Sequence, residues 1–349
     1  MIETELNTSF NDLSVCNMGG SSYKNCYVGN NLMIQTSVCV DNNNNYTVTA
    51  SLVNIVTNEV IREINTETFT SYTEILNVVH NGGYVYIILW VGASIKIYST
   101  SSDLTATPQL VSTLEEEGIG DHPAYITLST ADWSVSQHSY DAVIAFSNGI
   151  YVKGWGEGDY DFCGGGSNGV YIMFIWYKYD GTVKIERCTG SGNCYSTVLP
   201  DNYGGHDITG IIVFDNSTNS SHIYILESVT NYNYNLYKYV CDVDMNIGNR
   251  EFITNIPKNL GYIYGTPIGA VYTYYNPEQI ILHFFTLCRN SEDYCLEVIS
   301  FNSADNNWVI DYICPFMRVS NISPFTVDAS VYGENKYIIR TYIITLSFI

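Results

Sequence analysis

A recurring unit of strand-like segments is the feature of this sequence that most restricts its fold. Runs such as YVYIILWV (84–91) and QIILHFF (279–285) are rich in β-branched and aromatic residues, and turn residues bound them. Asn-Gly stands at 148–149 and Asp-Gly at 180–181, and both dipeptides are strong hairpin signals. The dominant hydrophobic period is two along the whole chain. The sequence therefore predicts an all-β fold.

A longer period is superimposed on the strands. The first strands of successive units are expected near Tyr72, Ala124, Ile208, Ile268 and Phe325, at spacings of 52, 84, 60 and 57 residues. One more unit fits upstream, at about 23–66. Modules of four strands at this period are typical of propeller blades, which bury their faces only against neighbouring blades. We therefore expect a single β-propeller of six or seven four-stranded blades.

Two details of this propeller are left open by the spacing. The 84-residue interval holds either one blade with the insertion GEGDYDFCGGGSNG (156–169) or two compact blades. From Phe325 only 25 residues remain, which is enough for two strands of a blade. We expect residues 1–22 to complete that last blade and close the ring, and residues 23–349 to form the propeller domain.

Three turns resemble the Asp-box of sialidase-like propellers, whose pattern is Ser-x-Asp-x-Gly-x-x-Trp between the third and fourth strands. FNSADNNWV has Ser303, Asp305 and Trp308, YSTSSDLTATPQLV has Ser101 and Asp103, and YKYDGTV has Asp180 and Gly181. In that family these turns are structural. The resemblance therefore implies a propeller fold, and it does not indicate an activity. Sialidase chemistry needs an arginine triad, and the six arginines of this chain lack that family's Arg-Ile-Pro context.

The charge balance restricts the partners. Only 14% of residues are charged, and the formal net charge is −21 at pH 7. Such a balance repels phosphate backbones and anionic lipid, so we expect no nucleic-acid partner. No run of about 18 apolar residues is present, so we expect no direct membrane insertion. The Tyr- and Asn-rich, Lys-poor composition resembles that of surface and virion proteins of thermoacidophilic archaea and their viruses.

Ten cysteines favour disulfides over a metal site, because no CxxC or His companion stands at ligand spacing. Three pairs flank Gly-, Ser- or Asn-rich turns, which is typical of bridges at hairpin necks. We expect Cys16–Cys26, Cys188–Cys194 and Cys288–Cys295, and the last bridge would join the second and third strands of a late blade. The pattern leaves Cys39, Cys163, Cys241 and Cys314 unassigned.

Cellular location is indicated by two opposed observations. Disulfides and five Asn-x-Ser/Thr sequons indicate an exterior location, whereas the N-terminus does not resemble a signal peptide. A virion protein would satisfy both, and so would a cytosolic protein of a hyperthermophile. We expect an extracellular or virion-surface location. The candidate glycosylation sites are Asn7, Asn45, Asn216, Asn219 and Asn321.

Candidate ligand-binding residues follow from propeller topology. Loops that enter innermost strands face the centre of the ring, and they carry GDHPAY, GGHDIT and GYIYGT. Two His/Asp pairs at matching places could bind a metal or a sugar, or could be turn residues that cap strand ends. Trp155 could stack on a sugar or lie at a blade edge. The candidates are Asp121, His122, His206, Asp207, Tyr262, Tyr264 and Trp155.

Three function classes are compatible with these patterns. The first is a non-enzymatic structural or attachment protein of an extracellular or virion assembly, which binds a neighbouring protein or a host glycan. The second is a carbohydrate-active, glycosidase-like enzyme. Glycosidase chemistry needs two carboxylates at a suitable separation, and the 35 acidic residues of this chain do not exclude such a pair. The third is a soluble lectin. We favour the first class, and we expect no catalytic residue, cofactor or metal.

Overall fold

The computed structural model describes residues 23–54, 56–114, 126–130, 132–139, 141–230, 233–258, 264–276, 279–289, 294–304, 306–316, 325–331 and 337–343. These residues form twenty-six β-strands, and no helix occurs among them. The strands group into six antiparallel units of four consecutive strands, followed by a pair of strands. We call the units blades 1 to 6 and the last two strands the C-terminal pair.

The first three blades hold the strands up to residue 155. Their bounds are β1 (Tyr23–Gly29), β2 (Leu32–Val40), β3 (Tyr46–Asn54) and β4 (Glu59–Phe69) in blade 1; β5 (Thr73–Asn81), β6 (Tyr84–Val91), β7 (Ser94–Ser101) and β8 (Gln109–Leu114) in blade 2; and β9 (Ile126–Ser129), β10 (Ser134–Ser139), β11 (Ala142–Ser147) and β12 (Ile150–Trp155) in blade 3.

The remaining strands form blades 4 to 6 and the C-terminal pair. Their bounds are β13 (Tyr160–Ser167), β14 (Tyr171–Lys178), β15 (Val183–Thr189) and β16 (Cys194–Val198) in blade 4; β17 (Ile208–Asp215), β18 (Ser220–Thr230), β19 (Asn233–Cys241) and β20 (Glu251–Pro257) in blade 5; β21 (Tyr264–Asn276), β22 (Gln279–Arg289), β23 (Tyr294–Asn302) and β24 (Trp308–Phe316) in blade 6; and β25 (Phe325–Val331) and β26 (Tyr337–Ile343).

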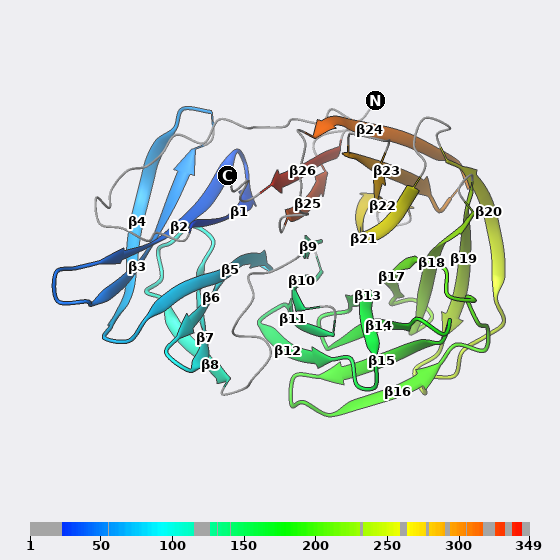
Figure 1. The fold of residues 1–349 in the computed structure, drawn as a ribbon, viewed down its shortest axis with the longest axis horizontal. Helices are drawn as coiled ribbons and strands as arrows, with labels where there is room; N and C mark the ends of the chain where they lie inside the picture. Colours follow the sequence, from blue (N-terminus) through cyan, green and yellow to red (C-terminus); the bar gives the residue numbers. More distant parts are fainter. Residues whose placement is uncertain are drawn as a thin grey trace.

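The blades follow one another around a ring, with the first strand of each blade toward the centre (Figure 1). β1 lies beside both β5 and β25, so the first and last described units are neighbours. Two pairs of innermost strands are hydrogen-bonded in parallel, β9 with β25 and β13 with β17. The predicted β-propeller is confirmed by this topology. The role of residues 1–22 in closing the ring stays a prediction, because they lie outside the described residues.

The Gly-rich segment is an innermost strand and not an insertion. Residues 160–167 form β13, so the 84-residue interval holds two compact blades, and the alternative of one blade with an insertion is wrong. The glycines allow β13 to approach β17 closely. A Cβ atom on Gly164 would lie 1.9 Å from the carbonyl oxygen of Gly210, and one on Gly166 would lie 2.0 Å from that of Ile212. Only residues without a side chain fit this backbone contact.

The cores lie between neighbouring blades. Apolar side chains of β6 and β11 form one cluster, in which the rings of Tyr86 and Phe146 stack with centroids 4.3 Å apart. Other clusters join blades 1 and 2 and blades 4 and 5, and the largest extends over blades 3 to 6. Blades 2 to 5 are thus covered on both faces by their neighbours, which explains why their central strands are apolar at nearly every position.

Strand order gives the ring two different faces. We call one the connection face, because it carries the links from the outermost strand of one blade to the innermost strand of the next. The turns between second and third strands lie on this same face, since the strands alternate in direction. The opposite face carries the turns between first and second strands and between third and fourth strands.

The turns that resemble the Asp-box divide between the two faces. Asp103 lies between β7 and β8, the third and fourth strands of blade 2, and its Oδ1 accepts hydrogen bonds from the Thr105 backbone N–H and hydroxyl. Ser303 also lies between a third and a fourth strand, and Asp305 is outside the described residues. Asp180 lies between second and third strands, so this turn departs from the family's pattern.

The cysteines confirm one expected bridge and correct another. Cys188 and Cys194 form a disulfide between β15 and β16. Cys26 carries a buried thiol in the core between blades 1 and 2, so the expected Cys16–Cys26 bridge is wrong. Cys16 itself lies outside the described residues. The Cys26 side chain points into the apolar core, away from a hairpin neck.

The other cysteines divide in the same way. Cys288 and Cys295 are directly opposite each other on β22 and β23, as expected for second and third strands, and their bridge stays a prediction. Cys39 is disulfide-bonded, whereas Cys163 and Cys241 carry thiols. Burial raises the pKa of the Cys241 thiol to about 11, which keeps it protonated at neutral pH.

Candidate functional site

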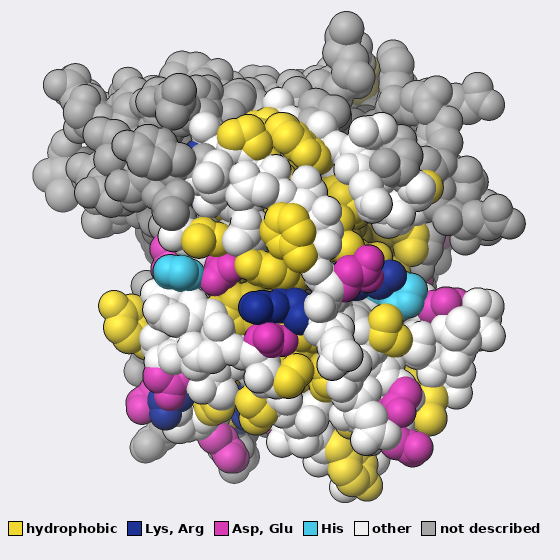
Figure 2. All heavy atoms as spheres, turned by 90° about the vertical axis from the view of Figure 1, so that its right-hand side faces the viewer, with side chains coloured by type: hydrophobic (Ala, Val, Ile, Leu, Met, Phe, Trp, Pro, Cys, Tyr) yellow, Lys and Arg dark blue, Asp and Glu magenta, His cyan; other side chains and the backbone are white. Residues whose placement is uncertain are grey.

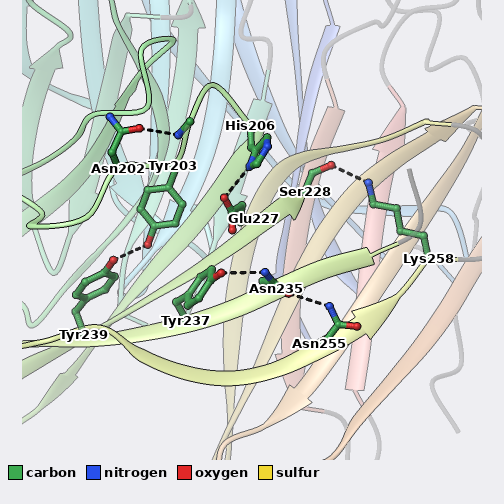
Figure 3. A network of polar contacts seen from close by, with 11 residues as sticks. Asn202, Tyr203, His206, Glu227, Ser228, Asn235, Tyr237, Tyr239, Asn255 and Lys258 are labelled. Carbon is green, nitrogen blue, oxygen red and sulfur yellow. Dashed lines mark hydrogen bonds and ion pairs between the residues drawn. The ribbon is translucent and has the colours of Figure 1, made fainter. Parts of the chain in front are cut away.

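His206 and Asp207 lie where the sequence predicted, in the link that leads into β17 on the connection face. The His206 Nδ1 atom is 2.8 Å from Oε1 of Glu227, and the two side chains are 39% and 8% exposed. Figure 3 shows the imidazole directed at this carboxyl group. His206 is therefore anchored by an acidic residue of β18 that the sequence had not singled out.

The Asp207 backbone anchors the same link. Its carbonyl oxygen accepts a hydrogen bond of 2.9 Å from the Ser228 N–H, and the His206 N–H donates to the Tyr203 carbonyl at 3.1 Å. Burial, with the nearby Asp207 carboxylate, raises the pKa of Tyr177 to about 12. His206 and Asp207 are thus capping residues of a turn as well as surface groups, which was one of the two roles expected for them.

A chain of amide and phenol groups continues from Glu227 across blade 5. Burial and the charge of Glu227 raise the pKa of Tyr237. The Asn235 Nδ2 group donates to the Tyr237 hydroxyl at 2.9 Å, and the Asn255 Nδ2 group donates to Asn235 Oδ1 at 2.8 Å (Figure 3). This network spans β18, β19 and β20, so the polar side chains hold the three strands together at this end of the blade.

A second polar network joins blade 5 to blade 6. Lys258 Nζ donates to the Ser228 hydroxyl at 2.7 Å and lies 4.4 Å from the centre of the Tyr234 ring. The Tyr234 hydroxyl donates to Glu297 Oε2 at 2.9 Å, and the Thr286 hydroxyl donates to the same oxygen at 2.6 Å. Glu297 and Thr286 are fully buried. These contacts satisfy buried polar groups and fix the two blades relative to each other.

The other predicted residues do not join this site. Trp155 ends β12 in blade 3 and is 36% exposed, with Lys153 Nζ 5.1 Å from its ring centre. Its expected place beside an insertion is wrong, because a turn and β13 follow it. Tyr264 begins β21, opposite Arg289. Asp121, His122 and Tyr262 lie outside the described residues, so their pairing with the His206 loop stays a prediction.

Three sequons fall within the described residues. Asn45 follows the turn between β2 and β3, while Asn216 and Asn219 share the turn between β17 and β18. The Asn45 Nδ2 group donates to Asp41 Oδ2 at 2.8 Å, so this amide is engaged in its own turn. Asn216 and Asn219 are exposed, and Asn7 and Asn321 are outside the described residues. Glycosylation of these sites stays a prediction.

The residues that sequence reasoning missed share a recognisable pattern. Glu227 in HIYILES and Glu297 in YCLEVIS are each a single acidic residue inside an otherwise apolar strand. An ionisable group in such a position is almost never buried without a partner. Each therefore predicts a hydrogen-bond donor nearby. The sequence does not say which donor, because His206, Tyr234 and Thr286 come from other strands and loops.

Among the described residues, no group of three or more His, Cys, Asp or Glu side chains is arranged to hold a metal ion. No helix in the described part of the chain is long and apolar enough to cross a membrane. Within each network the polar groups contact one another, which supports the fold. His206, Asn235, Ser228 and Asn255 remain at least partly exposed.

Comparisons with known proteins concern the fold alone. No protein-family model matches the chain, and no curated protein matches it. Among solved structures it is similar to SapL1 lectin in complex with alpha methyl fucoside, at 9% identity and a TM-score of 0.44 over 76% of this chain and 87% of the lectin. Drosophila Plexin A in complex with Semaphorin 1b gives 9% identity and 0.43 over 92% and 83%.

A third similar structure is the alpha-L-arabinanase of Penicillium chrysogenum complexed with arabinobiose. It gives 12% identity and a TM-score of 0.38, over 76% of this chain and 72% of the arabinanase. The assignment as a β-propeller rests on the strand order and the ring described above.

Proposed function

We propose that this chain is a non-enzymatic structural or attachment protein of an extracellular or virion assembly, and that it binds a neighbouring protein through the outermost strands of its blades. The observation that carries the proposal is the exposure of large apolar side chains on β4, β8, β16 and β20. Seven such side chains are between 40% and 62% exposed: Val60, Ile61, Leu110, Val111, Tyr195, Val198 and Phe252.

The outermost strand of a blade is suited to protein contact. One of its edges has backbone N–H and C=O groups without a partner strand in the same blade, and a second protein can pair with them. Figure 2 views the molecule from the side of blade 5. On that side, apolar side chains are interspersed with acidic and basic side chains, some of which neighbour each other. An apolar surface interspersed with charged groups is typical of protein interfaces.

An exterior location is consistent with the covalent chemistry of the chain. The Cys188–Cys194 disulfide joins the two outermost strands of blade 4, next to the exposed β16 residues. Such bonds persist in oxidising surroundings. The low proportion of charged residues and the exposed sequons add to this reading. The virion surface remains the more specific part of the proposal.

Sedimentation tests the proposal. Particles or filaments collected by ultracentrifugation from cells that make the protein should contain it. The double substitution Ile61→Lys with Leu110→Lys should release it into the supernatant, because two charges would be buried in the interface. Val170→Lys is the matched control, since Val170 is 66% exposed in a turn and lies on no outermost strand. Retention of the double variant, or absence of the wild-type protein from the pellet, would overturn the proposal.

A carbohydrate-binding function is the second candidate. The half-exposed Trp155 at the connection face favours it, because an aromatic ring can stack on a sugar. A lectin should bind glycans without changing them, whereas a glycosidase-like enzyme should hydrolyse them. If purified protein hydrolysed a glycan and His206→Ala or Asp207→Ala abolished the reaction, the enzyme would replace the binding protein.

A further inference from the structure

Three aromatic side chains meet on the connection face between blades 1 and 2. Tyr46 begins β3, Tyr72 lies in the link between β4 and β5, and Trp90 is near the end of β6. The ring centroids of Tyr46 and Tyr72 are 5.8 Å apart at 71°, and those of Tyr72 and Trp90 are 6.3 Å apart at 85°. The plane of the central ring is thus steeply inclined to the planes of both neighbours. Tyr72 is 56% exposed, although its size favours burial.

The Tyr72 link and the turn that precedes Tyr46 are anchored by backbone hydrogen bonds. The Gly92 N–H donates to the Tyr72 carbonyl at 2.9 Å, which ties the link to the turn after β6. The Asp41 carboxylate accepts hydrogen bonds of 2.8 Å from the N–H groups of Asn43 and Asn45, which orders the turn before Tyr46. The aromatic cluster is therefore held in place before any ligand arrives, and a preorganised site loses less entropy on binding.

Polar groups accompany the rings. The Tyr72 hydroxyl donates to Glu74 Oε2 at 3.2 Å, which leaves the other carboxylate oxygen lone pairs to accept further donors. Lys24 is buried nearby on β1, and burial lowers its pKa while the charge of Glu74 acts in the opposite direction. The negative charge of Glu74 is therefore closer to the surface than the positive charge of Lys24.

We propose that Tyr46, Tyr72, Trp90 and Glu74 form a binding site for a neutral pyranose at the end of a glycan. The C–H face of a pyranose packs on an aromatic ring, and its hydroxyls donate to a carboxylate. Glu74 and the net charge of −21 disfavour sialylated or uronic-acid sugars. The site lies on the connection face and does not depend on the proposed contacts of the outermost strands.

Saturation-transfer NMR on the full-length protein tests this site. The probes are the methyl glycosides of glucose, galactose, mannose and fucose, with methyl sialoside as the acidic comparison. At least one neutral glycoside should bind, with a Kd of about 1 mM, as for a small ligand on an open surface. Tyr72→Ala should weaken this binding at least about tenfold, which corresponds to about 1.4 kcal/mol. Glu74→Gln, which keeps the shape of the side chain, should weaken binding as well.

Tyr84→Ala is the matched control, because Tyr84 is an exposed tyrosine of the same blade that lies on the opposite face. This variant should bind the glycoside as the wild type does. The site is overturned if no neutral glycoside binds, if methyl sialoside binds better, or if Tyr72→Ala and Tyr84→Ala lose affinity equally. Because sedimentation with particles is a separate readout, failure of this site leaves the outermost-strand contacts standing, and the reverse also holds.

Discussion

Between blades 1 and 2 the Tyr72 hydroxyl donates to Glu74, and between blades 5 and 6 the Tyr234 hydroxyl donates to Glu297. Both pairs lie toward the connection face, and both combine a tyrosine with a glutamate. Tyr72 is largely exposed, whereas Tyr234 and Glu297 are fully buried beside Lys258. The same chemical pair can therefore stabilise the fold in one junction and remain available to a ligand in the other.

The difference is one of environment. In the junction of blades 5 and 6, each hydrogen bond replaces water that has been removed, so losing one partner leaves a buried polar group unsatisfied. In the junction of blades 1 and 2, water or a ligand can take the place of a lost partner. Substitutions that are matched between the two junctions should accordingly have unequal effects on stability.

The largest difference is expected at the two carboxyl groups. Glu297→Ala should lower the free energy of unfolding by about 4 kcal/mol, because it creates a cavity and removes the buried carboxylate that accepts hydrogen bonds from the Tyr234 and Thr286 hydroxyls. Glu74→Ala should lower it by less than about 1 kcal/mol. Urea denaturation of both variants measures the difference. Equal losses would show that the two junctions are not distinct.

Acid should separate the same blades in a second way. Burial lowers the pKa of His283 in blade 6 to about 3, and it lowers that of His80 in blade 2 to about 4. The ordinary histidine pKa is near 6.5. Between that pH and the lowered pKa values, both imidazoles are neutral in the folded protein but take up protons in the unfolded chain. Stability from both is present above pH 6.5 and is lost as the pH falls, by about 1.4 kcal/mol per pH unit for each group.

Below pH 4 only His283 continues to contribute to this loss. His283→Gln should therefore flatten the pH dependence down to about pH 3, whereas His80→Gln should flatten it only to about pH 4. Thermal unfolding followed by circular dichroism from pH 7 to pH 3 gives both curves. Parallel curves for the two variants would contradict the assignment of the deeper burial to blade 6.

The hydroxyl groups give a smaller contrast. Tyr234→Phe should cost about 1–2 kcal/mol, because Glu297 loses a hydroxyl donor in a buried site. Tyr72→Phe should change stability by less than about 0.5 kcal/mol, since water replaces the hydroxyl. Both variants keep the aromatic ring, so denaturation midpoints report the hydrogen bond alone. A larger loss for Tyr72→Phe would reverse the comparison.

The smallest effect is expected at the site that the sequence had predicted. His206→Gln should alter stability by no more than about 0.5 kcal/mol, because a contact in which one partner is more than a third exposed is screened by solvent. It should also leave glycoside binding unchanged, since His206 is in blade 5. Loss of glycoside binding in this variant would move the ligand site from blades 1 and 2 to the His206 loop.

The sequence predicted the fold better than the site. Period-two runs and the spacing of blade starts are local signals, and the predicted starts near Tyr72, Ala124 and Ile208 lie within two residues of β5, β9 and β17. The segment 156–169 misled as a candidate insertion, because three consecutive glycines resemble a loop. Glycine is required in this segment because its backbone packs closely against β17, more than 40 residues further along the chain. No local sequence pattern encodes that contact.

Site residues were harder to predict because they meet across separate strands and links. His206 was identified from its loop, but its partner Glu227 lies on β18. Tyr46, Tyr72 and Trp90 come from β3, the link between β4 and β5, and β6, and nothing in their spacing distinguishes them from the other aromatic residues of a Tyr-rich chain. The Cys16–Cys26 expectation failed for a related reason, since sequence proximity does not show which side of a strand faces the core.

Hydrogen–deuterium exchange on the assembled and the free protein is the most direct test of the central claim, that this propeller binds a neighbouring protein through its outermost strands. Amides of 59–64, 109–114, 194–198 and 251–254 should be protected in particles or filaments relative to the free protein. Those of 71–74 and 90–92 should exchange equally in both and gain protection only with a neutral glycoside. Protection of the connection face in the assembly, with none on the outermost strands, would contradict the account.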